Sequence, residues 1–253
     1  METINHTSRI VNLPTIGSIA TMPSRSATFS TMIHGVLSQV DKLFVFLDGF
    51  EEIPPELRDL PNCHATLLPK QGNLHASSRY LAPHLFGADA VVVLFDDDIL
   101  YPPDYVTRIR LALTQYGDKA VIGFHGAIFM PPHHSYARNR HNFHFALQVE
   151  HDLNVHELGS GTAAFLSSRF RPNPATWRHY HMDDLYLAAE AVKANLALIA
   201  LKREAGWLKP LAENQDDSLW RATQQDDRVQ SYFMRDLLTQ YMQTTWNNWW
   251  QRA

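Results

Sequence analysis

The stretch that decides the fold runs Val91-Val92-Val93-Leu94-Phe95-Asp96-Asp97-Asp98. Its consecutive apolar residues predict a strand over 90–95 that is buried on both faces of a parallel sheet. Because alternate side chains of an extended segment share a face, we expect Asp96 and Asp98 to converge on one point while Asp97 points away. Open α/β sheets bind ligands just beyond the carboxyl ends of such strands, so the stretch also predicts where the site lies.

Apolar runs of strand length alternate with helix-period segments on both sides of this strand, which predicts an α/β layer fold. Further strands are expected at 16–20, 43–47, 65–68, 120–124 and 196–201, and regular structure is expected at 143–149 and 162–166. Helices are expected at 29–40, with Ser24 or Ser26 as the N-cap, at 104–116, with Asp104 as the cap, and after Asp183 and at 229–250. The two prolines of 131–142 predict a long loop or an insertion.

The composition excludes several classes of protein. The chain of 253 residues has 45 % hydrophobic and 19 % charged residues, as soluble globular proteins do. Its net charge of -4 argues against nucleic acid as a partner. The single cysteine, Cys63, excludes an intramolecular disulfide framework and fits a reducing cytoplasm. No signal peptide and no membrane span are expected.

The aspartates after the 90–95 strand suggest a metal site. Two hard carboxylates on one side, those of Asp96 and Asp98, suit Mg²⁺ or Mn²⁺, which keep open positions for phosphate oxygens and water. The alternative is a polar turn between a strand and a helix, with one aspartate as a cap. We favour the metal site, because like charges this close repel one another unless a cation offsets them.

Five segments occur in the order that a known family shows. They are Ile19-Ala20-Thr21-Met22-Pro23-Ser24-Arg25, Phe44-Val45-Phe46-Leu47-Asp48-Gly49, the stretch from Asp96 to Tyr105, Gly159-Ser160-Gly161-Thr162-Ala163-Ala164-Phe165, and Met182-Asp183-Asp184-Leu185. With these, residues 15–205 resemble the family 2 type glycosyltransferases with the GT-A fold. The resemblance implies a Rossmann-like, mostly parallel central sheet flanked by helices, and an acidic DxD motif that holds a divalent metal against the diphosphate of the donor.

The resemblance also implies roles for particular residues. It places Thr21, Arg25, Asp48, Gly72, Arg79, Asp96 and Asp97 at the nucleotide, Ser160, Gly161 and Thr162 at the acceptor, and Asp96 and Asp98 at the metal. Ser78-Arg79-Tyr80 departs from the Ala-Arg-Asn type of segment that is common in the family. Each assignment has an ordinary alternative: Asp48-Gly49 also fits a simple turn, and Lys70 and Arg79 also fit exposed surface.

The acidic pair Asp183-Asp184 stands at an expected helix start, where aspartates serve as caps and interact with the helix dipole. The resemblance places both Asp183 and Asp184 in a catalytic pair, in which we expect Asp183 to act mainly through the helix cap. Asp184 matches the base of the family's catalytic pair, so it is expected to take the proton from the acceptor hydroxyl. The block of nine histidines between His125 and His181 fits no compact zinc motif, although one of them could complete the coordination of a metal at Asp96 and Asp98.

The expected domain organisation is a GT-A domain over 1–210, with a nucleotide half at about 15–125 and an acceptor half at about 126–210, followed by a helical extension at 211–253. Phe233, Leu237, Leu238, Tyr241, Met242, Trp246, Trp249 and Trp250 make this extension rich in apolar residues. We expect it to pack on its own domain or on a second subunit of a homo-oligomer. The alternative is peripheral contact with the inner face of a membrane, close to a lipid-linked acceptor.

The predicted function is metal-dependent, inverting transfer of a sugar from a nucleoside-diphosphate sugar, with UDP preferred, to a glycan or lipid-linked acceptor. The resemblance implies that Asp48, which follows an apolar strand, favours UDP over GDP or CMP. One alternative is a sugar-nucleotide nucleotidyltransferase, although Thr21-Met22-Pro23-Ser24-Arg25 lacks the glycines of a phosphate-binding loop. Another is a noncatalytic module of the same fold that binds nucleotide or sugar.

Overall fold

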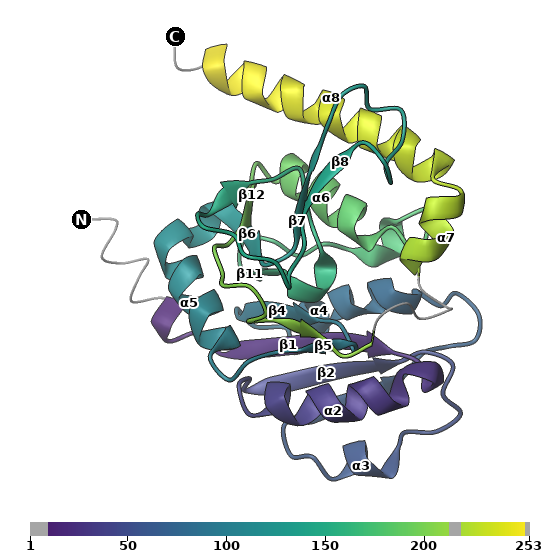
Figure 1. Cartoon of the computed structure of the whole chain (residues 1–253). Helices are drawn as coiled ribbons and strands as arrows, with labels where there is room; N and C mark the ends of the chain where they lie inside the picture. The colour runs from purple at the N-terminus through teal and green to yellow at the C-terminus, as the bar shows by residue number, and fades with distance from the viewer. Residues whose placement is uncertain (1–9, 213–218, 251–253) are drawn as a thin grey trace.

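A large mixed sheet forms the centre of the molecule (Figure 1). The computed structural model describes residues 10–212 and 219–250, the last seven of them by their backbone alone. The eight strands of the sheet lie in the order β3 (Cys63–Leu67), β2 (Lys42–Leu47), β1 (Thr15–Thr21), β4 (Val91–Phe95), β11 (Ala164–Leu166), β6 (Ala120–Gly123), β12 (Ala197–Ala200) and β9 (Leu153–Asn154). The fold is therefore α/β with a mostly parallel central sheet flanked by helices, which is compatible with a Rossmann-like fold.

The direction of the strands changes in the middle of the sheet. Strands β3, β2, β1 and β4 pair in parallel, whereas β11 runs antiparallel to both of its neighbours, β4 and β6. Strand β12 is parallel to β6, and β9 is antiparallel to β12. Two small sheets complete the fold: β10 (Glu157–Leu158) with β7 (Gly126–Phe129) and β8 (Arg140–Phe143), and β13 (Lys209–Pro210) with β5 (Ile99–Leu100).

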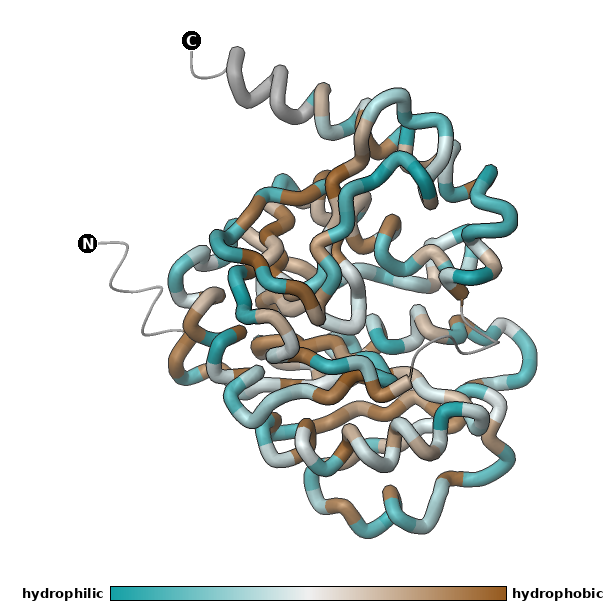
Figure 2. Tube along the Cα trace, viewed as in Figure 1, coloured by the Kyte–Doolittle hydropathy of each residue, from teal (hydrophilic) through white to brown (hydrophobic). Residues whose placement is uncertain are grey.

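Helices cover both faces of the large sheet, so β4 is buried on both sides. One face carries α2 (Ser26–Leu37) and α5 (Tyr105–Tyr116) over Val91, Val93 and Phe95. The other carries α4 (Ala82–Phe86), α6 (Asp183–Lys193) and α8 (Arg228–Trp250) over Val92 and Leu94. This alternation explains the uninterrupted apolar run, since each successive side chain enters a different core. Figure 2 shows the hydrophobic colour along these central strands.

Most predicted elements are confirmed, with their ends shifted by a few residues. The regular structure predicted at 143–149 is largely wrong: Phe143 ends β8, and residues 144–149 form a loop in which Val149 makes an isolated bridge with Arg203. The 131–142 segment is mainly a loop, as predicted, but its last residues from Arg140 belong to β8. The apolar residues of this segment suggested regular structure, but Phe145 and Val149 are loop residues whose side chains are buried in the core.

The predicted helix caps are also wrong in detail. A 3₁₀ helix, Pro23–Arg25, leads into α2, so Arg25 occupies the N-cap position, and the Ser26 hydroxyl donates to the Pro23 carbonyl instead. Asp104 does occupy the N-cap position of α5, but its carboxylate makes no capping hydrogen bond. It accepts hydrogen bonds from Arg108, one turn further along α5, and from Trp207, which only the tertiary structure brings close.

The C-terminal segment packs on its own domain, in agreement with the preferred interpretation. Helix α8 lies against α6, where Phe233 meets Tyr186 with ring centroids 4.9 Å apart, and Met234 and Leu237 are fully buried. The loop before β8 is tied to the start of α8, because the Tyr136 N–H donates to the Ser231 hydroxyl at 2.8 Å. The side chains of Trp246, Trp249 and Trp250 lie outside the described residues. No helix in the described part of the chain combines the length and apolar character that crossing a bilayer would require.

Leu237→Ala tests this packing. The substitution should lower the free energy of unfolding by about 2–5 kcal/mol, because it leaves a cavity under α8 in a fully buried position. Tyr232→Ala on the same helix is the matched control, since Tyr232 is 73 % exposed. Urea denaturation of both variants gives the measurement. Equal stabilities for the two variants would contradict the docking of α8 on the domain.

Candidate functional site

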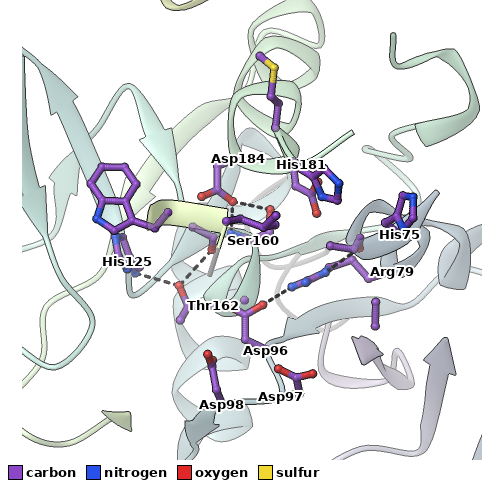
Figure 3. Close-up of a pocket in the computed structure, with 18 of the residues that line it drawn as sticks. His75, Arg79, Asp96, Asp97, Asp98, His125, Ser160, Thr162, His181 and Asp184 are labelled. Carbon is purple, nitrogen blue, oxygen red and sulfur yellow. Dashed lines mark hydrogen bonds and ion pairs between the residues drawn. The ribbon is translucent and has the colours of Figure 1, made fainter. Parts of the chain in front are cut away.

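A cavity of about 410 Å³ opens at the carboxyl ends of β1 and β4 (Figure 3). After β1 the chain builds β2 and β3 on one side, and it then returns to place β4 on the other side of β1. Such a reversal separates the loops that follow the two strands and leaves a crevice between them. The predicted site residues that line it are Thr21, Arg25, Asp48, Arg79, Asp96, Asp97, Asp98, Ser160, Gly161, Thr162, Asp183 and Asp184.

One residue of the same prediction lies elsewhere. Gly72 does not line the cavity; it adopts a φ of 68°, which favours glycine in a turn. Lys70 is exposed on the same loop. Arg79, by contrast, is not part of an exposed surface, because only 6 % of it is accessible and it lies at the bottom of the cavity.

The acidic run occupies the turn between β4 and β5. Burial raises the pKa of Asp97 to about 6. Burial, and then the charges of Asp96 and Asp97, raise the pKa of Asp98 to about 7. The guanidinium of Arg25 lies 3.8 Å from the Asp98 carboxylate. Positive charge in this part of the cavity would therefore be stabilised by carboxylates that water solvates poorly.

Arg79 supplies part of that positive charge. It extends from the 3₁₀ helix His75–Leu81, and its Nη1 donates to the Phe95 carbonyl at 3.1 Å and to Asp96 Oδ1 at 2.5 Å. The Asp96 N–H donates to the Tyr101 hydroxyl at 2.8 Å, which in turn donates to the Gly161 carbonyl at 2.6 Å. These bonds fix Asp96 between the end of β4 and the turn that precedes β11.

That turn, the 3₁₀ helix Ser160–Thr162, connects the two groups of acids. The N–H and the hydroxyl of Ser160 both donate to Asp184 Oδ1, each at 2.7 Å. The next residue, Gly161, packs so closely against Asp96 that a Cβ built there would overlap the Asp96 carboxylate. The Thr162 hydroxyl oxygen accepts from the N–H groups of Phe124 and His125 and anchors the turn to β6. Consecutive residues of one turn therefore touch Asp184 and Asp96.

The acidic pair begins α6, but neither carboxylate caps the helix. Met182 holds the N-cap position and the cap has no side-chain hydrogen bond, so the capping role predicted for Asp183 is wrong. Asp183 is buried and accepts a hydrogen bond from the Ser77 hydroxyl at 2.7 Å, and burial raises its pKa to about 6. Burial also raises the pKa of Asp184, whose Oδ2 accepts no hydrogen bond from the described residues.

Asp48 lies at the cavity with both oxygens engaged by protein groups. The Asn73 amide donates to Oδ1, and His75 Nδ1 lies 2.8 Å from Oδ2. Its assignment to the base edge of a nucleotide stays a prediction; in the structure Asp48 orients His75. The His75 ring lies 5.2 Å from that of His181, and both residues have positive φ angles, 49° and 67°.

Several cavity residues lie outside the motifs quoted from the sequence, among them His75, His181, Tyr136 and Trp220. His75 follows a glycine-asparagine turn, which was the one local signal. Tyr136 and His181 reach the cavity from loops, and Trp220 reaches it from helix α7 (Leu219–Gln225). The spacing of residues in the sequence does not predict either position.

The donor set fits a divalent cation that is shared with a ligand. Within the described residues no three His, Cys, Asp or Glu side chains gather as a complete metal cluster. The carboxylates of Asp96 and Asp98 are 37 % and 35 % exposed at the cavity. Mg²⁺ is commonly held by one or two carboxylates together with substrate phosphates and water, so two partly exposed carboxylates suit that use better than an all-protein cage.

Comparison of the sequence with known proteins finds no matching family model and no curated protein with significant similarity. Function therefore has to be inferred from the residues of the site.

Gly161→Ala tests the contact between the turn and Asp96. The added methyl group should displace the carboxylate, break its ion pair with Arg79 and lower the free energy of unfolding by about 1–3 kcal/mol, because a buried guanidinium loses its partner. Gly35→Ala in α2 is the control: its nearest new neighbour is 3.8 Å away, so it should be neutral or stabilising. Denaturation curves and a crystal structure of the variant give the measurement. An unmoved Asp96 at unchanged stability would contradict the predicted overlap.

Proposed function

We propose that this chain is a metal-dependent, inverting glycosyltransferase. It would move a sugar from a nucleoside-diphosphate sugar, with UDP as the preferred nucleotide, to a hydroxyl acceptor. One observation carries the proposal: Ser160 binds Asp184 while Gly161 packs against Asp96, so a candidate base and a candidate metal ligand face one cavity. Sugar transfer needs these two functions close together, because the acceptor attacks the same carbon that the diphosphate leaves.

The proposed reaction is a single displacement. The acceptor oxygen forms a bond to the anomeric carbon, the bond from that carbon to the diphosphate oxygen breaks, and its electron pair leaves with the diphosphate. A Mn²⁺ or Mg²⁺ ion held by Asp96 and Asp98 would offset the negative charge of the leaving group. The acceptor proton goes to Asp184 Oδ2, while Ser160 holds Oδ1 in place. Burial raises the pKa of Asp184, which makes its carboxylate a better base.

One alternative has support from a specific contact. The Arg79 guanidinium already neutralises part of the charge on Asp96, as expected of a module that binds a nucleotide or sugar without turnover. A product assay with candidate sugar nucleotides separates this module from an enzyme. Among the described residues, no contact specifically favours the nucleotidyltransferase alternative.

Asp98→Ala tests the metal. Calorimetry with UDP in the presence of Mn²⁺ should show binding to the unchanged chain and loss of the Mn²⁺-dependent part in the variant, because one of two carboxylate ligands is gone. Asp59→Ala is the control, since Asp59 is exposed and lies outside the cavity. Retained Mn²⁺-dependent binding in Asp98→Ala would reject the metal assignment. Tight binding of GDP with none of UDP would show that the predicted nucleotide is wrong.

Asp184→Asn tests the base. The asparagine oxygen can still accept both hydrogen bonds from Ser160, so UDP binding should stay nearly unchanged while turnover falls by roughly 10²-fold or more. Asp183→Asn is the matched neighbour and should reduce turnover less, since Asp183 is hydrogen-bonded within the protein. NMR of the product gives its anomeric configuration. Retention of the donor's configuration would reject the inverting mechanism, and near-normal turnover of Asp184→Asn would remove Asp184 as the base.

A further inference from the structure

An aromatic wall borders the cavity next to the acidic pair of α6. It consists of Trp220 from α7 and Tyr136 from the loop before β8, and both residues line the cavity. Their ring centroids lie 6.4 Å apart, in an edge-to-face arrangement. Trp220 is 38 % exposed, whereas Tyr136 is 7 % exposed, so the indole is the part of this wall that a ligand can contact.

A buried cation holds the wall in place. The Arg140 guanidinium lies 4.6 Å from the ring centre of Tyr136 and 5.4 Å from that of Trp220. It is ion-paired with Glu157 at 2.7 Å, and the Tyr136 hydroxyl donates to the same carboxylate at 2.9 Å. Arg140 Nη1 and Glu157 Oε2 are buried without a hydrogen-bond partner among the described residues. A network of this kind is costly to bury, and it fixes the indole before any ligand arrives.

The wall lies on the side of the proposed base. Ser160 follows Glu157 by three residues and holds Asp184. Burial, the charge of Glu157 and, after these, the charge of Asp184 raise the pKa of Tyr136 well above its usual range, so the hydroxyl stays protonated. The wall is thus within electrostatic reach of Asp184, where an acceptor hydroxyl would have to lie.

Two polar residues line the cavity together with the exposed indole. Thr223 lies one turn after Trp220 on α7, Gln230 lies on α8, and both line the cavity. A sugar ring has the complementary surface, with C–H groups on its face and hydroxyls around its edge, whereas a peptide hydroxyl offers no such face. The cation at the wall, Arg140, is buried and ion-paired, so it offers no accessible charge to an anionic group. The surface therefore suits a neutral sugar.

We propose that Trp220, backed by Tyr136 and Arg140, is an acceptor subsite that takes a neutral sugar ring, so that the acceptor is a glycan or glycoside. This inference rests on the proposed function, because it needs Asp184 to be the base. Trp220 stacks on the ring face, and Thr223 and Gln230 hydrogen-bond to its edge. The stacking orients one hydroxyl toward Asp184 Oδ2.

The test uses neutral methyl glycosides of glucose, galactose and N-acetylglucosamine as probes, with UDP and Mn²⁺ present. Saturation-transfer NMR on the full chain should show transfer to the ring C–H protons of at least one glycoside. Trp220→Ala should weaken that binding more than tenfold, and Trp220→Phe should retain part of it because a ring remains. Gln224→Ala is the control on the same helix, since Gln224 is exposed and lies outside the cavity.

The outcomes separate this proposal from the one before it. Unchanged glycoside binding in Trp220→Ala, or no signal from any of the three probes while UDP binds, overturns the acceptor subsite and leaves the glycosyltransferase proposal standing. If Trp220→Ala weakens UDP-glucose relative to UDP, the donor's own sugar occupies the wall, and the acceptor assignment is wrong. Glycoside binding that depends on Trp220 in a chain that binds no nucleotide supports a sugar-binding surface at Trp220, but it overturns both the glycosyltransferase and the acceptor role of that surface.

Discussion

The ion pair between the buried guanidinium of Arg79 and the carboxylate of Asp96 is the interaction on which the site depends. It joins the 3₁₀ helix His75–Leu81 to the end of β4, and Asp96 in turn packs against Gly161. The remaining carboxylates have little compensation: burial raises the pKa of Asp97 to about 6, of Asp98 to about 7 and of Asp183 to about 6. An acid whose pKa is higher in the folded than in the unfolded state contributes stability at low pH and loses it as the pH rises, here between about 4 and 7. At neutral pH these acids therefore work against folding, as groups kept for binding or chemistry do.

Individual strands could be predicted from the sequence where their residues form a clear apolar run. The 90–95 run was decisive because a strand buried on both faces needs apolar residues at every position. The 143–149 segment misled because its apolar residues, Phe145 among them, are buried from a loop, and burial alone does not distinguish a loop from a strand. The reversed direction of β11 left no local signal, since pairing direction depends on how the chain returns to the sheet.

The site, too, could be predicted in part. Its acidic residues could be identified because aspartates that follow a buried strand or begin a helix form a pattern in the sequence itself. The partners of these acids could not: Ser77 meets Asp183 across 106 positions of sequence, and that contact replaced the expected cap. The rings of His75 and His181 lie close together, and both residues have a left-handed backbone conformation. The presence of a histidine in the sequence does not predict that conformation. Trp220 lines the cavity beside Tyr136, and the loop that carries Tyr136 is hydrogen-bonded to the start of α8, a contact that spans 95 positions of sequence.

The position of these residues in the chain also sets the order in which the site can be completed during synthesis. The acids from Asp48 to Asp184 leave the ribosome before α7 and α8, which supply Trp220, Thr223 and Gln230 to the cavity. Translation adds about 5–20 residues per second, so a nascent chain passes through a period of seconds in which its carboxylates are present and one wall is missing. Whatever part of the desolvation cost depends on that wall therefore arises late, when all strands of the large sheet have already been synthesised.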